Sequence, residues 1–334
     1  MSAVYVHGWA GACAAGASLE AALEAMKAPP VPPAPLWLGH GALAAAYPYR
    51  AMPDFAPMPW AERRRRLAEA ALAGRTGGTH SALLVASSSL DIGRVEVDGR
   101  FSADTLVPAE ELAAAIGWRG PVLGVDSACT SAFQALRLAR DLLRADAALQ
   151  EACVLGLELR SRYVGAGFAA MQLTHPWPEP GGLVLGAGAA ALWLARPQER
   201  WRIAGLAHVV DSAHPAGTSP AALREAVEAA CAEAGIGAAS VRRVKVHAAG
   251  HAPGDAEEAA VLAALLPQQA ERIHFKPWLG HTQGASGALE VALLLSMPAR
   301  GTDAGPPVRH TLVVGIGFGG AHAALVLEDA HAHA

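Results

Sequence analysis

The stretch VDSACTSAF (residues 125–133) places one cysteine between an apolar segment and a segment of helical composition. The residues PVLGVDSA (121–128) are predicted to form a buried strand, and SAFQALRLARDLLRA (131–145) a helix. Cys129 would then lie where the helix presents unpaired N–H groups and the positive end of its dipole. That position should lower the pKa of the thiol and favour a reactive thiolate. The competing interpretation is a small, inert core residue.

Strands and helices alternate outward from this junction. Further strands are predicted at 3–9, 81–89, 151–159, 202–212 and 241–250, with an apolar, glycine-broken segment at 183–195 and two strands joined by a glycine turn at 311–328. Helices are predicted at 60–74, 218–237 and 255–266. This alternation predicts a mostly parallel sheet covered by helices, and its recurrence predicts two similar halves, 1–198 and 199–334. The proline-rich stretches 29–35 and 47–60 should be extended surface connections without helix or central strand.

The composition argues against several classes of function. Of the 334 residues 52% are hydrophobic and 17% charged, and the formal net charge is −4, so no basic field points to a nucleic-acid partner. The basic cluster RRRR (63–66) is expected on a solvated helix face, with docking of an acidic partner as the alternative. The four cysteines form no CxxC pair, which favours reduced thiols in the cytoplasm. No signal peptide is expected, and the apolar runs are too short to cross a membrane.

Two histidines and a glycine turn are expected at the carboxyl ends of strands, where such a sheet places its active-site groups. His247 lies in KVHAAGHAPGD, His281 in KPWLGHTQGASGALE, and the turn GFGG occupies 317–320. The glycines around both histidines would let a long substrate approach the backbone. An imidazole beside Cys129 would make this residue a nucleophile rather than a packing residue.

A metal site is the competing interpretation of the first histidine. His247, His251 and Asp255 could together bind a divalent metal. Gly250 and Pro253 interrupt the regular helix on which such ligands are usually spaced, and the glutamate of a zinc-protease motif is missing. We therefore expect no metal at these residues.

Four blocks together resemble the signature blocks of the elongating (type I/II) β-ketoacyl-acyl-carrier-protein synthases, within the thiolase-fold superfamily. The blocks are VDSACTSA, VHAAGHAPGD, KPWLGHTQGASG and GIGFGGAHAALVLE, in the family's order, and AVYVHGWAGACAAG resembles its opening strand and turn. The resemblance implies a thiolase-like α/β fold, in which two similar βα halves form a layered α-β-α-β-α core with mixed, mainly parallel sheets. It places Cys129 in the N-terminal half, and His247, His281 and the GFGG turn in the C-terminal half.

The same blocks indicate a subclass. Thiolases carry a second cysteine in the last block, where this chain has Phe318. Initiating synthases have an asparagine where this chain has His281, and non-catalytic chain-length factors typically lack the cysteine that is present here as Cys129. The resemblance therefore implies a decarboxylating, elongating enzyme.

The resemblance also implies a role for each matched residue. Cys129 would take an acyl chain from a carrier-protein thioester, with the backbone N–H groups of Cys129 and Phe318 holding the oxyanion. Neutral His247 and His281 would donate N–H groups to the malonyl thioester while CO₂ is lost. Lys276 and Glu290 would orient the histidines, Phe318 would gate the acyl chain, and Ala249, His251, Gly317 and Gly319 fall where the family binds the pantetheine arm. No metal or redox cofactor is implied.

Three departures from the family concern substrate binding. Ala249 and His251 stand where the family usually offers two threonines to the pantetheine arm, and Ala187 in GAGA replaces an acidic residue. The chain is also shorter than typical members, in the regions 30–60 and 160–182 that line the family's acyl tunnel and dimer interface.

Three functions follow as candidates. The first is condensation on carrier-protein thioesters in fatty-acid-like or polyketide-like biosynthesis, with a specialised pathway favoured. The second is transfer of the acyl group from Cys129 to an alcohol or amine, and the third is a non-catalytic subunit that shapes the tunnel of another synthase. The expected partners are an acyl carrier protein and either a second copy of the chain or a related synthase subunit, but neither nucleic acid nor membrane.

Overall fold

The computed structural model describes residues 3–52, 58–99, 106–177, 181–298 and 308–332. The main sheet contains β1 (Tyr5–Cys13), β4 (Ser81–Ala86), β5 (Val122–Val125), β6 (Glu151–Glu158), β8 (Gly188–Ala195), β9 (Trp201–Val210), β10 (Arg243–Lys245), β11 (Glu271–Ile273), β12 (His310–Gly317) and β13 (Ala321–Asp329). A small second sheet contains β2 (Ala34–Leu38), β3 (Ala45–Arg50) and β7 (Leu185–Gly186). The helices are α1 (Leu19–Ala25), α2 (Trp60–Leu72), α3 (Ile92–Asp98), α4 (Leu106–Ala115), α5 (Ser131–Ala145), α6 (Arg162–Ala170), α7 (Pro220–Glu233), α8 (Ala252–Leu265), α9 (Lys276–Leu279) and α10 (Ser286–Ser296).

The two halves of the main sheet repeat one strand order. Outward from the centre, the first half is β1-β8-β6-β4-β5 and the second is β9-β13-β12-β10-β11. The halves meet where β1 pairs antiparallel with β9. In each half the three outer strands are parallel and the last strand in sequence is antiparallel to both of its neighbours. The predicted mixed sheet in two similar βα halves is confirmed, and the boundary predicted at 198/199 falls between β8 and β9. The sheet is not mostly parallel as predicted, because among the described residues four of its nine strand pairings are parallel and five are antiparallel.

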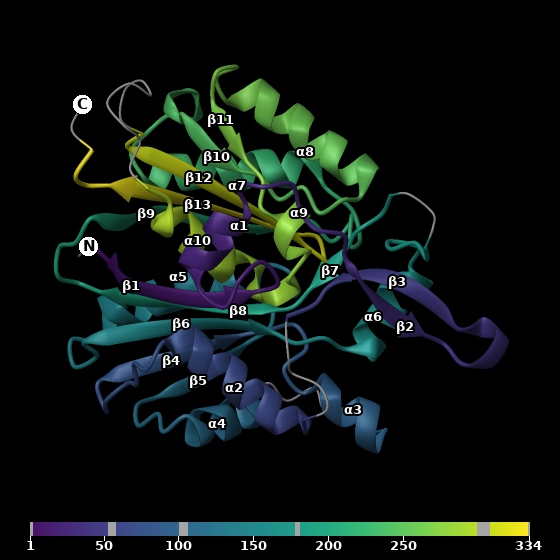
Figure 1. Ribbon diagram of the computed structural model, residues 1–334. Helices are drawn as coiled ribbons and strands as arrows, with labels where there is room; N and C mark the ends of the chain where they lie inside the picture. The colour runs from purple at the N-terminus through teal and green to yellow at the C-terminus, as the bar shows by residue number, and fades with distance from the viewer. Residues whose placement is uncertain (1–2, 53–57, 100–105, 178–180, 299–307, 333–334) are drawn as a thin grey trace.

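Helices α5 and α10 form a central layer between the two halves of the sheet (Figure 1). Their apolar side chains share one core with residues of β1, β4, β6, β8, β9, β12 and β13. A second core packs α2 and α4 against the outer face of the first half, and a third packs α7 and α8 against that of the second. The order of layers is therefore α-β-α-β-α, as the resemblance implies. This layering brings the ends of strands from both halves to the start of α5.

The proline-rich region departs from its prediction. An extended connection without a central strand was predicted, but β2 and β3 form an antiparallel hairpin, and β3 also pairs in parallel with β7, so that β3 is the middle strand of the small sheet (Figure 1). The prolines are tolerated because Pro35 lies on the edge strand β2, and Pro48 of β3 lies outside the two residues, Tyr49 and Arg50, that pair with β7. Leu36, Leu38 and Tyr49 of the hairpin are buried in a fourth cluster, beside the candidate site. Residues 53–57 of the predicted connection lie outside the described part.

The arginine cluster is only partly the solvated face that was predicted. Arg65 and Arg66 are paired with glutamates of their own helix. Arg64, however, is 3% exposed and reaches Glu111 at 3.2 Å. Its position in the four-residue run turns it toward α3 and α4, because successive helical residues are about 100° apart. Across the described residues no helix is long and apolar enough to span a membrane.

Candidate active site

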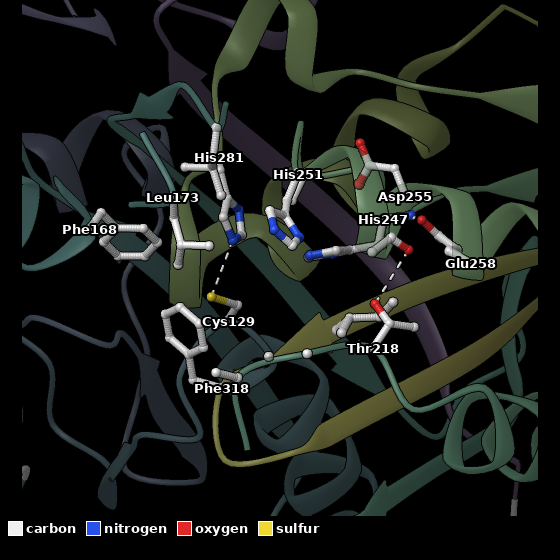
Figure 2. Close-up of a pocket in the computed structure, with 17 residues that line it drawn as sticks. Cys129, Phe168, Leu173, Thr218, His247, His251, Asp255, Glu258, His281 and Phe318 are labelled. Atoms are coloured by element: carbon white, nitrogen blue, oxygen red, sulfur yellow. Dashed lines mark hydrogen bonds between the residues drawn. The ribbon is translucent and has the colours of Figure 1, made fainter. Parts of the chain in front are cut away.

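Three predicted site residues meet in one place although they lie in three separate parts of the sequence. Cys129 precedes α5, His247 follows β10, and His281 follows α9. The Nε2 atom of His281 lies 3.2 Å from the sulfur of Cys129, and the two imidazole rings meet edge to face with their centroids 5.2 Å apart (Figure 2). All three side chains are buried. The geometry is that of a thiol with two imidazoles at its side.

The turn that presents the cysteine is tight and held by side chains. Ala128 has a φ of 47°, a left-handed conformation that is uncommon for alanine. The Ser131 hydroxyl donates to the Ala128 carbonyl at 2.6 Å, and the Thr130 hydroxyl donates to the Ser127 carbonyl at 2.8 Å. The turn also closes against the end of β12, because a Cβ on Gly317 would come within 3.2 Å of the Cys129 backbone nitrogen. A strained turn fixed in this way aims the sulfur into the cavity.

The thiol of Cys129 is not the low-pKa group that its position at a helix start predicted. Cys129 is only 6% exposed. Burial raises its pKa to about 12, and the charge of Glu158 adds to the increase, whereas Lys276 and the Phe318 backbone N–H oppose it. Desolvation therefore outweighs the helix dipole, whose effect is modest. At neutral pH the resting site holds a neutral thiol, so ionisation must be coupled to proton transfer.

Both histidines are neutral at physiological pH. Burial, reinforced by the charge of Lys276, lowers the pKa of His281 to about 3 and that of His247 well below 6.5. A neutral imidazole can accept a proton at one nitrogen and donate from the other. The Nδ1 atom of His281 lies 3.2 Å from the Ser286 hydroxyl, which can donate or accept and so suits either tautomer. His281 is therefore able to act as a base toward the thiol or as a donor toward an oxyanion.

Lys276 and Glu290, the two residues expected to orient the histidines, form a buried ion pair and do not line the cavity. The Lys276 ammonium donates to the His247 carbonyl at 2.6 Å and to the Glu290 carboxylate at 2.7 Å. A second buried lysine, Lys245, pairs with the other oxygen of the same carboxylate. Sequence reasoning missed Lys245, although a charged residue in a short central strand two positions before His247 was a usable signal.

Glu258, another residue that the sequence did not single out, fixes the backbone of the first histidine. Its carboxylate accepts the N–H groups of His247 at 2.5 Å and of Ala248 at 2.7 Å. The Ala248 carbonyl accepts from His274 at 2.9 Å. Ala248 itself has a φ of 36°, so it is held in a left-handed conformation by contacts on both sides. This strained backbone conformation at Ala248 directs the His247 ring into the cavity.

This strain gives a testable prediction for stability. Replacing Ala248 with glycine removes the Cβ that disfavours positive φ, so we expect the free energy of unfolding to rise by about 0.5–1 kcal/mol. The matched control is Ala249→Gly, because φ at Ala249 is not in the left-handed region and glycine there should cost about 0.5–1 kcal/mol. Urea denaturation measures both. An equal decrease in the free energy of unfolding in the two variants would show that the Ala248 backbone is not strained.

A cavity of about 70 Å³ opens at the sulfur. Phe168, Leu173 and Phe318 gather on one side of Cys129 (Figure 2). The rings of Phe168 and Phe318 lie 5.5 Å apart and pack on the buried cluster of the hairpin. A water molecule needs roughly 10–15 Å³ on this scale, so only a few small groups fit before the aromatic rings must move. This placement supports the predicted gating position of Phe318.

The other side of the cavity is polar. His251, Asp255 and Glu258 of the loop and helix after His247 face Thr218 (Figure 2), and Ala249 and Gly317 also line the cavity. The hydroxyl of Thr218 was not foreseen, and it donates to the Gly254 carbonyl at 3.4 Å. Gly319, predicted among the binding residues, is not part of this lining. It forms the turn after β12 with a φ of 78°, and its N–H donates to the Pro215 carbonyl at 2.7 Å.

The alternative metal site lacks a converging ligand set. The Asp255 carboxylate accepts a hydrogen bond from the Gly250 N–H at 3.0 Å, and it does not converge with the imidazoles of His247 and His251 on a common point. His251 is the N-cap residue of α8, whereas the His247 ring packs against that of His281. Within the part of the chain that the structure describes, no group of three or more histidine, cysteine, aspartate or glutamate side chains is arranged to hold a metal ion.

Glu158, at the end of β6, ties the first half of the sheet to the loop that carries His281. Its carboxylate accepts from the Ser88 N–H at 2.5 Å and from the Gly284 N–H at 3.1 Å. The hydroxyls of Ser88 and Ser89 also donate to it. Burial nevertheless raises its pKa to about 7. No sequence pattern indicated this contact, because its members come from three distant segments.

Two family descriptions match the chain over most of its length. Residues 64–200 match "Beta-ketoacyl synthase, N-terminal domain" and residues 202–307 match "Beta-ketoacyl synthase, C-terminal domain". The chain belongs to the β-ketoacyl synthase family. The resemblance read from the four sequence blocks is thereby confirmed, together with the thiolase-like fold.

Curated relatives of this β-ketoacyl synthase come from polyketide biosynthesis. It is similar to "Polyketide synthase ThaG" of Burkholderia thailandensis, with 31% identity over 74% of this chain and 5% of the relative. It is also similar to "Putative polyketide beta-ketoacyl synthase 1" of Streptomyces virginiae, with 29% identity over 72% of this chain and 70% of the relative. The chain thus spans a small part of the large synthase and about two thirds of the other relative.

Solved structures support the fold. A ketosynthase (ApeO) in complex with its chain length factor (ApeC) from Xenorhabdus doucetiae superimposes with a TM-score of 0.79 at 20% identity, covering 98% of each chain. A β-ketoacyl synthase from Burkholderia phymatum has a TM-score of 0.76 at 20% identity, covering 99% of this chain and 100% of that chain. The chain therefore shares the fold of these two structures over almost their whole length.

Proposed function

We propose that this protein condenses an acyl group carried on Cys129 with a malonyl unit carried by an acyl carrier protein, releasing CO₂ and a β-ketoacyl thioester. The observation that carries the proposal is the convergence of Cys129, His247 and His281 on one cavity, with the sulfur 3.2 Å from His281 Nε2. A buried thiol and two neutral imidazoles are the groups that nucleophilic acyl transfer and enolate stabilisation require.

In the first half-reaction the sulfur attacks the carbonyl carbon of an acyl thioester. The thiol proton passes to His281 Nε2 as the carbon–sulfur bond forms, which explains how a thiol with a raised pKa can react. The tetrahedral oxyanion accepts from the backbone N–H groups of Cys129 and Phe318. When the tetrahedral intermediate collapses, the carrier thiolate leaves and takes the proton, so the enzyme holds an acyl-Cys129 thioester.

In the second half-reaction malonyl thioester enters the same cavity. The bond between its carboxylate and the α-carbon breaks, CO₂ leaves, and the electron pair passes into an enolate. His247 and His281 donate N–H groups to the enolate oxygen, which is possible because both are neutral. The α-carbon then attacks acyl-Cys129, and the Cys129 thiolate leaves and takes up one proton from solvent. Atoms and charges balance without a metal or a redox cofactor.

The setting we propose is polyketide-like or fatty-acid-like biosynthesis in the cytoplasm, with a specialised pathway favoured. Support comes from the polyketide relatives, and from four free and buried cysteines that suit a reducing compartment. The proposed partners are an acyl carrier protein and a second subunit of the same fold, either another copy or a related synthase. One similar structure contains a ketosynthase together with its chain length factor.

Two other functions remain as competing proposals. Transfer of the acyl group to an alcohol or amine is favoured by Ala249 and His251, which offer no hydroxyl to the arm of a second carrier protein on the polar side of the cavity. A non-catalytic subunit role is favoured by the similar complex with a chain length factor. The complete set of Cys129, His247 and His281 favours catalysis over that role.

The test supplies the protein with acyl and malonyl carrier proteins and follows both half-reactions. We expect an acyl adduct on Cys129 by intact-mass and peptide mass spectrometry, release of CO₂, and a β-ketoacyl product. An adduct with transfer to added alcohols or amines but no CO₂ would identify the acyltransferase. Neither adduct nor CO₂, with stimulation of a partner synthase, would identify the non-catalytic subunit.

A further inference from the structure

A second lysine is buried deep in the charged cluster behind the histidines. Lys245 is the last residue of β10 and its side chain is 0% exposed. Because side chains alternate along a strand, Val244 enters the outer core while Lys245 faces α9 and α10. A fully buried lysine is rare unless it is paired, since removing an ammonium from water is costly. Lys245 therefore has a structural or functional reason to be there.

Its contacts make Glu290 a carboxylate shared by two ammonium groups. Lys245 Nζ donates to Glu290 Oε2, and to the Val314 carbonyl of β12 at 3.0 Å. Glu290 Oε1 accepts from Lys276 at 2.7 Å, and Lys276 continues to the His247 carbonyl. The chain of contacts runs from Lys245 through Glu290 and Lys276 to the backbone of a proposed oxyanion donor.

The second buried acid explains why two lysines are needed. Glu258, on α8, lies within electrostatic reach of both Lys245 and Lys276, and its carboxylate holds the His247 backbone N–H. Counted together, Glu258, Glu290, Lys245 and Lys276 carry two negative and two positive charges. Among the described residues, the neutral rings of His247, His281 and His274 are the other titratable groups close to this cluster. Without Lys245, one net negative charge would lie behind the rings.

We propose that Lys245 is a positioning residue of the condensation site, which balances the buried charge behind His247 so that no net negative charge opposes the carboxylate and enolate of the extender unit. This inference rests on the proposed decarboxylative function. It assigns Lys245 to the second half-reaction, in which negative charge develops at the histidines, and not to acyl loading of Cys129. Burial lowers the pKa of Lys245 to about 8 although Glu290 opposes the decrease.

The sign of the pH dependence follows from that pKa. Below about pH 8 Lys245 is charged and the cluster is balanced; above it the ammonium loses its proton and the excess negative charge appears. CO₂ release should therefore fall as the pH rises through 8. Replacing Lys245 with methionine keeps a chain of similar length without charge, so the variant should be slower by about tenfold at pH 7 and show no such decline.

The experiment measures CO₂ release from malonyl-pantetheine between pH 6.5 and 9.5, and acyl loading of Cys129 by mass spectrometry, for the full chain. Lys27→Met, an exposed lysine outside the cluster, is the matched control. The double variant Lys245→Met/Glu290→Gln leaves Lys276 and Glu258 as one positive and one negative charge. We expect it to recover CO₂ release at least threefold over Lys245→Met, which a purely structural role of Lys245 would not produce.

The results for Lys245→Met and for the double variant either support or overturn the proposed role of Lys245. A slow, pH-flat Lys245→Met variant with normal loading of Cys129, rescued in the double variant, supports the inference. Unchanged rate and pH profile, or equal losses of loading and CO₂ release without rescue, would overturn it while wild-type decarboxylation still upheld the proposed function. A wild-type protein that releases no CO₂ from malonyl-pantetheine or from malonyl carrier protein would overturn both.

Discussion

Cys129→Ala should abolish condensation, with a loss of at least about 10³-fold, because Cys129 is the only thiol among the described residues that line the cavity. The acyl adduct seen by mass spectrometry should disappear with it. CO₂ release from malonyl thioester should persist within about tenfold, since His247 and His281 remain and the enolate does not need the sulfur in order to form. The variant should therefore separate the two half-reactions.

The matched control for this variant is Cys231→Ala. Cys231 is also buried and free, but it lies on α7 in the outer core of the second half. We expect the Cys231→Ala variant to load Cys129 and to catalyse condensation at the normal rates. An acyl adduct that survives in Cys129→Ala, or that disappears in Cys231→Ala, would show that the nucleophile has been assigned to the wrong residue.

The two histidines should differ in which half-reaction they affect. His247→Ala should lower CO₂ release by about 10²–10³-fold, the effect of losing one oxyanion donor, with Cys129 loading largely retained. His281→Ala should lower both, because His281 also contacts the sulfur at 3.2 Å. Single-turnover loading and steady-state CO₂ release measure the two effects separately.

His310→Ala serves as the control for both histidine variants. His310 begins β12, at the opposite end of that strand from Gly317 and the cavity. Its replacement should change the rate of Cys129 loading and the rate of CO₂ release by no more than about twofold. Equal effects of His247→Ala and His281→Ala on loading would contradict the division of labour that the sulfur contact implies.

The amino-acid sequence alone identified the residues that can react and most of the elements that carry them. The helix predicted at 131–145 is observed as α5 (Ser131–Ala145), and the glycine turn between two strands at 311–328 is observed between β12 and β13. These elements are local: apolar periodicity, a proline at a helix start or a glycine pair is enough to specify them. The four blocks then identified the family, because several rare patterns coincide in order.

Prediction from sequence was weaker where several segments contribute to one environment. The Pro-rich region was expected to be an extended connection without helix or central strand, yet β3 forms the middle strand of a small sheet between β2 and β7. Arg64 was expected in solvent and is buried against Glu111, on a helix 47 residues away in sequence. In both cases the deciding partner lies far along the chain.

The electrostatics of the site was decided by the tertiary structure alone. A cysteine before a helix suggested a depressed pKa, but enclosure by both halves excludes water and raises it to about 12. Lys245, Glu258 and Glu158 acquire their roles only when β10, α8 and β6 meet the two histidine loops. Sequence specifies which groups are available; burial and the distance between charges, which set their protonation states, exist only once the two halves have closed around α5 and α10.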